Sequence, residues 1–432
     1  MTDRTITGLA ARRVWDSRGH PTVEVEVALA SGATGRAIAP AGASRGSREA
    51  VDLRDGGAKL KGLGVDLALA NLRGPVAETL FGMDAVNQSA VDAALIALDG
   101  TPTKSRIGGN ATVAASLAVL QAAAAASHQP LWSHLAATLG TTPSVPLPEI
   151  QIFGGGAHAG RRVDVQDFMV MVPGATSFAE ALEVTAEIYH AAGAILAAKG
   201  RSGGVADEGG WWPDFRTNEE AMDTLIEAIT KAGETPGKRV VISLDIAASE
   251  LYRDGVYRLG LEKRSLTTDG MCDYLGGWLT QYPIVSIEDP LAEGDTAGLV
   301  AFTTTHGNRV QVIGDDALVT NADLVRQLAT AGACNAVLIK VNQTGTVTGA
   351  LEAFRAARAL GWGTIVSARS GETEDVAISH LSTGLGAGQL KVGSFARSER
   401  MAKWNECLRI EEVLGPKAFV GGAPLAATWW QG

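Results

Sequence analysis

The stretch Ile284-Val-Ser-Ile-Glu-Asp289 is a short apolar run that ends in two carboxylates. Similar runs recur through the second part of the chain, separated by stretches with helical spacing. They are VVISLD (240–245), VQVIGDD (310–316), AVLIKVN (336–342), TIVSARS (364–370) and QLKVGS (389–394). Apolar strands that alternate with helices are typical of a parallel sheet covered by helices. Because these units are too numerous for a small open sheet, we predict a (β/α)8 barrel.

An ionisable side chain ends each of these runs. The six residues are Asp245, Glu288, Asp315, Lys340, Arg369 and Lys391. The carboxyl ends of barrel strands converge on one mouth, where barrel enzymes place their active sites. Strands also end at the surface, where charges are readily solvated. Solvent exposure therefore explains any single one of these six charges as well as a shared site does. It explains less well why the first three are acidic and the next three basic, so we predict one shared site.

This order of charges indicates metal-assisted chemistry on an anion. Three converging carboxylates repel one another unless a cation holds them, and Mg²⁺ prefers such oxygen ligands. Arg369 and Ser370 suit a phosphate group through forked hydrogen bonds. A lysine among cations has a lowered pKa and can act as a base. Together these groups fit the removal of a proton α to a carboxylate, with metal neutralising the enolate.

The first part of the chain has a different pattern. Residues 22–29 (TVEVEVAL) alternate strictly between apolar and polar side chains, which predicts a half-buried strand. A Ser31-Gly32 turn and a short strand around residues 36–39 complete a predicted hairpin. From about residue 65 to residue 139 the spacing becomes helical.

These patterns divide the chain into two predicted domains. Asn110 is the expected N-cap of an alanine-rich helix in the first of them. Residues 140–148 are rich in proline and predict a linker. We therefore predict an N-terminal α+β cap domain over residues 1–140 and a barrel domain over residues 141–432.

Composition excludes some classes of function. The chain has 432 residues, is 46% hydrophobic and carries a formal net charge of −10. An acidic chain is a poor general binder of nucleic acid or anionic lipid, so an anionic substrate needs a local cationic site. The most apolar stretch, residues 113–127, is mostly alanine and predicts a packed helix rather than a membrane span. Three widely spaced cysteines and an N-terminus without an apolar signal core predict a cytoplasmic protein.

Ordered blocks along nearly the whole chain resemble the enolase family. They are DSRGHPTVEVEV (16–27), GASRG (42–46), GGGAHAG (154–160), VQDFM (165–169), ADEGG (206–210), SLDIAASE (243–250), SIEDP (286–290), GDDALVTN (314–321), LIKVNQTGT (338–346), RSGETED (369–375) and RSERMAKWNECLRIEE (397–412). The resemblance implies an α+β cap on an atypical (β/α)8 barrel. It also implies a homodimer or higher homo-oligomer that acts on a small anionic substrate.

The resemblance assigns a metal and base half to the site. It implies two Mg²⁺ ions, the first held by Asp245, Glu288 and Asp315. Ser44 corresponds to a mobile-loop serine that helps bind the second ion once substrate arrives. Lys340 corresponds to the base that takes the α-proton, and Lys391 to the lysine that faces the substrate carboxylate.

The resemblance also assigns a phosphate and leaving-group half. Arg369 and Ser370 correspond to phosphate contacts, and Gln166 to a substrate-binding residue. Glu208 corresponds to the acid that assists departure of the β-hydroxyl, with Asp167 as its partner. His158 corresponds to a mobile-loop histidine near the phosphate. Without the resemblance, a packing or loop role is the better interpretation of His158.

Four departures from the family pattern fall in this second half. Ala368 replaces a histidine, and Asp167 replaces a longer glutamate. Ala41 and Arg45 replace serine and threonine in the loop that carries Ser44. Trp211-Trp212-Pro213 replaces a Phe-Ala-Pro type sequence.

These departures predict that enolate formation survives while the substrate differs. Arg45 and the space at Ala368 suit an additional anionic group, as in the enolase-like enzyme that makes carboxyphosphoenolpyruvate in phosphinate natural-product pathways. Two alternatives stay open. One is an ordinary enolase that converts 2-phosphoglycerate to phosphoenolpyruvate and water. The other is a catalytically silent scaffold that keeps a metal site.

Overall fold

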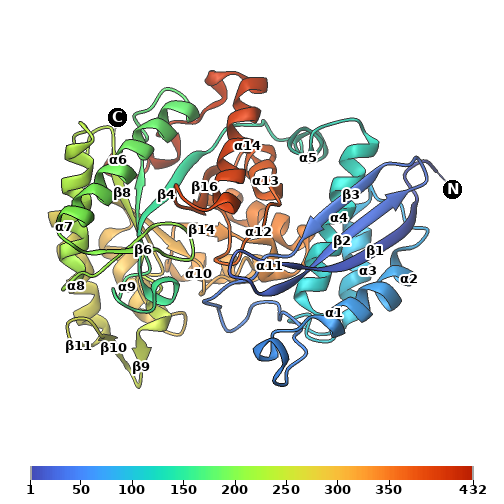
Figure 1. The fold of residues 1–432 in the computed structure, drawn as a ribbon, viewed down its shortest axis with the longest axis horizontal. Helices are drawn as coiled ribbons and strands as arrows, with labels where there is room; N and C mark the ends of the chain where they lie inside the picture. The colour runs from blue at the N-terminus through green and yellow to red at the C-terminus, as the bar shows by residue number, and fades with distance from the viewer. Residues whose placement is uncertain (1, 431–432) are drawn as a thin grey trace.

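The computed structural model describes residues 2–430, which form a barrel with a smaller lobe beside it (Figure 1). The smaller lobe contains a three-stranded antiparallel sheet in the order β1-β2-β3. Its strands are β1 (Ile6–Trp15), β2 (Pro21–Leu29) and β3 (Thr34–Ile38). The predicted hairpin corresponds to β2 and β3. The prediction missed β1, because ITGLAARRVW lacks a strict alternation of apolar and polar residues.

The smaller lobe also contains helices, and the longest of them packs directly on β2 and β3. The helices are α1 (Asp66–Asn71), α2 (Ala77–Leu80), α3 (Gln88–Asp99), α4 (Gly109–Ala126) and α5 (Leu131–Leu139). Helix α4 is long and apolar enough to cross a membrane by length and composition, but 83% of it is buried inside the fold. It approaches β3 so closely that a Cβ added to Gly35 would lie 2.1 Å from the Ala122 nitrogen. This close contact explains why small residues are required there.

The predicted N-cap of α4 is wrong. Gly108 occupies the N-cap position with a φ of 104°, and Asn110 lies inside the helix. The Asn110 Oδ1 accepts a hydrogen bond from the Leu53 N–H at 3.1 Å, and its Nδ2 donates to the Leu53 oxygen at 3.2 Å. Asn110 therefore ties the segment after β3 to the helix instead of capping the helix.

The barrel is closed by eight strands within the described residues. They are β4 (Leu147–Gly154), β5 (Asp167–Met171), β8 (Val241–Asp245), β12 (Ile284–Glu288), β13 (Gln311–Gly314), β14 (Ala336–Ile339), β15 (Gly363–Ser367) and β16 (Gly388–Gly393). Pairing of β16 with β4 closes the ring. Strand β5 is antiparallel to both of its neighbours, β4 and β8. The fold class is confirmed, but the expectation of an all-parallel sheet is wrong at β5.

Strands β4 and β5 were not predicted either. Strand β4 contains Pro148 and the buried polar residues Glu149 and Gln151, so it shows no continuous apolar run. Beyond β4 the sheet continues through β7 (Trp211–Pro213) and β6 (Ser202–Val205). A separate small sheet contains β9 (Tyr252–Arg253), β10 (Val256–Leu259) and β11 (Arg264–Leu266).

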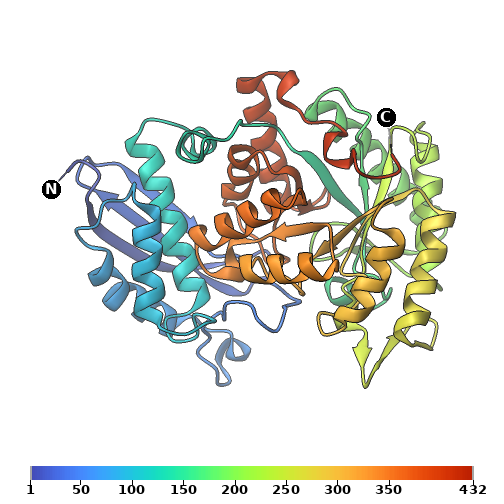
Figure 2. The ribbon, with the colours of Figure 1, turned by 180° about the vertical axis from the view of Figure 1, so that it is seen from behind.

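Helices surround the barrel on its outside (Figures 1 and 2). They are α6 (Phe178–Ala198), α7 (Asn218–Lys231), α8 (Thr268–Gln281), α9 (Thr296–His306), α10 (Ala322–Ala331), α11 (Val341–Thr344), α12 (Val347–Ala359), α13 (Ala377–Leu385) and α14 (Ser398–Leu414). Helix α12 also contacts α3 and α4, so it joins the barrel to the smaller lobe.

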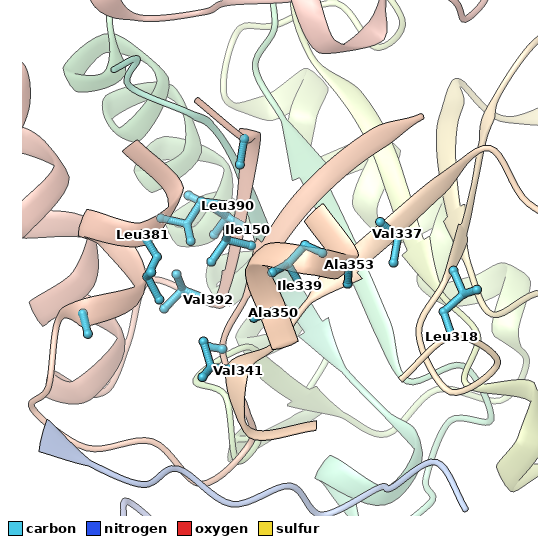
Figure 3. Close-up of a cluster of buried hydrophobic side chains, with 14 of the residues drawn as sticks. Ile150, Leu318, Val337, Ile339, Val341, Ala350, Ala353, Leu381, Leu390 and Val392 are labelled. Carbon is cyan, nitrogen blue, oxygen red and sulfur yellow. The ribbon is translucent and has the colours of Figure 1, made fainter. Parts of the chain in front are cut away.

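Apolar side chains fill the space between the barrel strands and these helices (Figure 3). Leu390 and Val392 of β16 lie with Ile150 of β4 and Leu381 of α13 in this layer. Successive side chains of a strand point to opposite faces. The packing of Leu390 and Val392 therefore directs Lys391, which lies between them, into the barrel.

Candidate active site at the barrel mouth

A polar pocket lies at the carboxyl ends of the barrel strands. It is lined by Gly42, Ser44, His158, Gln166, Asp167, Glu208, Asp245, Lys340, Ser367, Ala368, Arg369, Ser370, Lys391 and Val392. Most of the predicted site residues therefore share one pocket. Glu288 and Asp315 lie directly behind it, because each forms an ion pair with one of its lysines. Of the residues predicted for the site, Arg45 alone neither lines the pocket nor pairs with a residue that does.

Lys391 binds three carboxylates on neighbouring strands. Its Nζ lies 2.7 Å from the Asp245 Oδ2, 2.7 Å from the Glu288 Oε2 and 3.3 Å from the Asp167 Oδ2. Strand register brings the three acids together, because Asp245 pairs with Glu288 on one side and with Asp167 on the other. Burial lowers the pKa of Lys391, but these acids outweigh burial and hold its pKa well above the usual value. Lys391 is therefore a fixed ammonium group facing the pocket.

Lys340 is bound to Asp315 in the same pocket. Its Nζ lies 2.5 Å from the Asp315 Oδ2, while the Gln343 Nε2 donates to the Asp315 Oδ1 at 2.8 Å. The prediction of a lowered pKa for Lys340 is wrong for this arrangement. Burial and the nearby cations lower it, but Asp315 and Glu288 outweigh them and raise the pKa of Lys340. If Asp315 were a ligand of a bound cation, Lys340 would lose this partner and its neutral amine would be favoured.

The carboxylates behind the pocket suit a metal ion. Burial, followed by the charge of Asp245, raises the pKa of Glu288 well above its usual value. The Glu288 Oε1 is also buried and has no hydrogen-bond partner among residues 2–430. Hard divalent cations prefer oxygen ligands, so an unpaired carboxylate oxygen beside further carboxylates suits such a cation. The acidic groups Asp245, Glu288 and Asp315 are thus chemically suited to hold a metal.

The predicted ligands Asp245, Glu288 and Asp315 are not close enough to place one ligand atom each within 4.8 Å of the others, but two different groups of side chains in the described part of the chain are. One is Asp289, Asp315 and Asp316, and the other is His158, Asp167 and Glu208. Asp289 is less suited to a metal, because its two carboxylate oxygens accept the N–H groups of Asp315 and Asp316, both at 2.9 Å. Asp289 therefore fixes the turn that presents Asp315.

The predicted acid side of the pocket contains Glu208, Asp167 and His158. The His158 Nδ1 lies 3.6 Å from the Asp167 Oδ1 and 3.9 Å from the Glu208 Oε1. Burial lowers the pKa of His158, but the charges of Glu208 and Asp167 outweigh burial and raise it. Gln151, which sequence analysis did not single out, donates to the Asp167 Oδ1 and accepts the Gly210 N–H at 2.8 Å. Gln151 therefore links Asp167 to the segment that carries Glu208.

The two tryptophans after Gly210 support the same side from outside. Trp211 stacks on Tyr189 with ring centroids 4.9 Å apart, and its Nε1 donates to the backbone carbonyl oxygen of Tyr189 at 2.9 Å. The guanidinium of Arg162 lies 4.9 Å from the Trp212 ring centroid. A Cβ added to Gly160 would lie 3.2 Å from the same ring. Trp212 therefore contacts the loop that carries His158.

The predicted phosphate side is covered by the loop that carries Ser44. Arg369 donates from Nη1 to the Glu49 carboxylate at 2.9 Å. It also donates from Nη2 to the backbone carbonyl oxygen of Ser44 at 3.1 Å. The Ser370 Oγ accepts the Ala43 N–H at 2.6 Å. A Cβ at Gly42 would lie 1.9 Å from the Arg369 Nη2, so only glycine allows this approach. Glu49 was missed because nothing in its local sequence indicates a partner 320 residues away.

Arg45 does not have the position that was predicted for it. Its Nη2 lies 3.0 Å from the Asp52 Oδ2, and its side chain is exposed. Asp52 therefore holds its charge away from the pocket. Ala368, in contrast, lines the pocket, and its N–H donates to the Lys391 oxygen at 2.9 Å. The space predicted at Ala368 thus lies between the phosphate residues and Lys391.

Helix α14 fixes the backbone of the phosphate residues. The buried Arg400 donates from Nη1 to the Arg369 oxygen at 2.7 Å and to the Val392 oxygen at 2.8 Å. It also donates from Nη2 to the Ser370 oxygen at 2.5 Å. One buried guanidinium therefore joins the ends of β15 and β16, which sets the positions of Arg369, Ser370 and Lys391 together.

Two family models match the chain and together cover both lobes. Residues 142–428 match the model described as "Enolase, C-terminal TIM barrel domain". Residues 6–135 match the model described as "Enolase, N-terminal domain". The matched regions contain every residue of the pocket described above.

Proposed function

We propose that this chain, which belongs to the enolase family, removes the α-proton of a small phosphorylated or phosphonate-bearing carboxylic acid and forms an enol. Family membership makes it an enzyme of the carbon–oxygen lyase type or a related member of the superfamily. The observation that supports the proposal best is the pair of lysines in one pocket. Lys340 lies against Asp315 while Lys391 lies between Asp245 and Glu288.

Each residue of the pocket has a separate role in the proposed reaction. Lys340 takes the α-proton, and Lys391 holds the substrate carboxylate. Arg369 and Ser370 bind the phosphate or phosphonate group. Glu208 donates a proton to the leaving hydroxyl, and Asp167 and His158 orient it.

We propose two Mg²⁺ sites beside these residues. Asp245, Glu288 and Asp315 hold the first, and Ser44 contributes to a second that requires bound substrate. A divalent ion, when bound, supplies positive charge next to the enolate oxygens. The unpaired Glu288 Oε1 supports the first site. Ser44 lies in the pocket on the loop that contacts Arg369, which supports the second.

The substrate that we favour carries a carboxylate on its phosphorus. In this reaction 2-phosphoglycerate and phosphonoformate give carboxyphosphoenolpyruvate, inorganic phosphate and water. Phosphoenolpyruvate, which has no α-proton, gives carboxyphosphoenolpyruvate and inorganic phosphate without the step that Lys340 performs. The small side chain of Ala368 lies beside Arg369 and Lys391, which supports a larger anionic group at that place. Arg45 supports this less than expected, because it pairs with Asp52.

The second candidate is ordinary enolase activity, in which 2-phosphoglycerate gives phosphoenolpyruvate and water. Glu208, Asp167 and His158 lie together in the pocket, and this favours an intact leaving-group side. A silent scaffold is a weaker third candidate, because both lysines and their acids are in place. For all three we propose a cytoplasmic homodimer or higher homo-oligomer that binds neither nucleic acid nor membranes.

Proton exchange separates these candidates. The protein is incubated with Mg²⁺ and 2-phosphoglycerate in deuterium oxide, and α-proton exchange is followed by ¹H NMR while enol formation is followed by ultraviolet absorbance. Exchange without rapid enol formation supports the specialised reaction. Phosphonoformate is then added, and ³¹P NMR shows whether a carboxyphospho-enol ester forms. If neither exchange nor product is detected, the proposed function is wrong.

A further inference from the structure

A second cavity lies beside the candidate active site. It has a volume of about 340 Å³ and lies between the loop after β4 and the segment after β8. Cavities of this size are typical of small-molecule sites. Gln166 lines both this cavity and the catalytic pocket, so one side chain separates the two.

The amide of Gln166 has an unused hydrogen-bond acceptor. Its Nε2 donates to the Asp245 Oδ2 at 3.1 Å, which fixes the amide next to the candidate metal ligand. The side chain is only 6% exposed, and its Oε1 has no hydrogen-bond partner in the part of the chain that the structure describes. A buried carbonyl oxygen without a partner loses the hydrogen bond that it makes with water in the unfolded chain, which costs free energy. A hydroxyl or N–H group of a ligand would satisfy it.

The second cavity has an apolar wall and a cationic rim. Ala157, Val163, Ile246 and Leu251 provide apolar surface, and three arginines lie at the rim. Two of these are paired, because Arg161 lies 2.6 Å from Glu250 and Arg258 lies 2.7 Å from Asp254. The third, Arg253, is exposed and pairs with β10 through its backbone, while its side chain has no hydrogen-bond or ion-pair partner within residues 2–430. An unpaired guanidinium over an apolar wall suits an anionic group attached to an apolar body.

Buried polar contacts hold the walls in place. The Asp164 Oδ1 accepts the Gly260 N–H at 2.7 Å, which joins the two segments on either side of the cavity. Asn218, which is fully buried, donates to the Asp164 Oδ2 at 3.1 Å and accepts the Asp164 N–H at 3.1 Å. The cavity is thus bounded by a connected network of hydrogen bonds, which is expected of a preformed binding site.

We propose that this cavity binds a second small molecule beside the reacting acid. This molecule has an apolar body that packs on Ile246 and Leu251 and an anionic group that binds Arg253. One of its hydroxyl or N–H groups donates to the Gln166 Oε1 at the junction with the catalytic pocket. This inference rests on the proposed function, because it assumes that the reacting acid occupies the adjoining pocket.

Phenylphosphonate is a probe for this cavity, since it joins an anion to a flat apolar body. Its affinity for the full-length protein with Mg²⁺ is measured by isothermal titration calorimetry and compared with that of methylphosphonate. We expect phenylphosphonate to bind about tenfold more tightly, and Arg253→Ala to remove about tenfold of its affinity. Gly260→Trp should also weaken phenylphosphonate binding, because its side chain would obstruct the cavity. The backbone has room for this side chain, since a Cβ at Gly260 meets only the Asp164 Oδ1, at 3.5 Å.

Arg355→Ala is the matched control, because Arg355 is an exposed arginine of α12 that does not line the cavity. It should bind phenylphosphonate as the unmodified protein does. If either Arg253→Ala or Gly260→Trp keeps the original affinity while folded, as judged by circular dichroism, the proposed binding site is wrong. An equal loss in Arg355→Ala would assign the effect to net charge and also overturn it.

Exchange of the 2-phosphoglycerate α-proton is measured on the same samples. Normal exchange in all variants, with phenylphosphonate affinity dependent on Arg253, supports both proposals. Absence of exchange in the unmodified protein refutes the proposed function, whereas Arg253-dependent binding would still support the cavity as a binding site. The two failures are therefore distinguishable.

Discussion

The two halves of the site are held in different ways. The metal and base half lies on or directly after barrel strands, where register brings Asp245 next to Glu288 and packing directs Lys391 inward. The phosphate and leaving-group half depends on loops, which are positioned by Glu49, Gln151 and Trp212. The first half should therefore tolerate little change in its reacting groups, while the second should be adjustable to a different substrate.

Removing the base should give the largest effect. Lys340→Ala deletes the group that we propose takes the α-proton, and general-base catalysis contributes about 10²–10⁴-fold. We therefore expect α-proton exchange on 2-phosphoglycerate to fall by about 10³-fold or more. Exchange is measured by ¹H NMR in deuterium oxide. Lys199→Ala is a control, because this exposed lysine at the end of α6 pairs with Glu227 and does not line the pocket.

The Lys340→Ala result also tests the comparison between the halves. If exchange falls by less than tenfold, another group takes the proton and the strand-borne half is not the catalytic one. Thermal unfolding should be compared in parallel, since Asp315 loses its ion-pair partner in this variant. A variant that fails to fold is replaced by Lys340→Gln, which keeps most of the side-chain volume.

Loosening the phosphate loop should give the next largest effect. Glu49→Gln weakens the ion pair that orients Arg369 and disturbs the acceptor for the Gly46 N–H at 3.1 Å. A misplacement of about 1 Å at a reacting centre costs on the order of 100-fold in rate. We expect kcat/KM for the true substrate to fall by about 10–100-fold, with KM carrying most of the change.

Steady-state kinetics check this expectation, and Asp52→Asn is the matched control. Asp52 pairs with Arg45 and Arg54 on the same segment but does not contact Arg369. Its variant should keep kcat/KM within about threefold, as is usual for a partly exposed ion pair. Equal losses in both variants would show that the whole segment matters rather than the contact between Glu49 and Arg369.

The difference between residues on barrel strands and residues held by loops also explains which of them the sequence could predict. Residues at strand ends follow from local patterns, because an apolar run that ends in a charge marks both the strand and the mouth. Asp245, Glu288 and Lys391 were found in this way. The closed barrel itself followed from the recurrence of such runs, although the antiparallel direction of β5 leaves no local signal.

Residues that act through distant contacts could not be found in this way. Glu49 meets Arg369 across 320 residues, and Gln151 meets Asp167 from a strand that has no apolar run. The pKa of Lys340 was also mispredicted, because the sequence showed its neighbouring cations but not the 2.5 Å contact with Asp315. Arg45 was mispredicted for the same reason, since Asp52 binds it.

Restoring family side chains in the adjustable half should produce a smaller gain. Ala368→His combined with Asp167→Glu returns a titratable donor and the longer carboxylate to the pocket. We expect conversion of 2-phosphoglycerate to phosphoenolpyruvate to rise by about tenfold, within the range that a positioned acid or base contributes. The ultraviolet absorbance of the enol measures this rate. No increase, with α-proton exchange unchanged, would show that these two positions do not determine the substrate.

Removing the outer support of the His158 loop should have the smallest effect. Trp212→Ala deletes the contact with Arg162, and a partly exposed cation–π contact is worth about 0.5–1 kcal/mol. If only part of this energy holds the loop in its binding position, KM should rise by about two- to fivefold while kcat stays nearly constant. Trp212→Phe keeps a ring under Arg162 and should recover most of the loss. A large fall in kcat would mean that Trp212 affects Glu208 directly, so the leaving-group side would be as rigid as the strand-borne half.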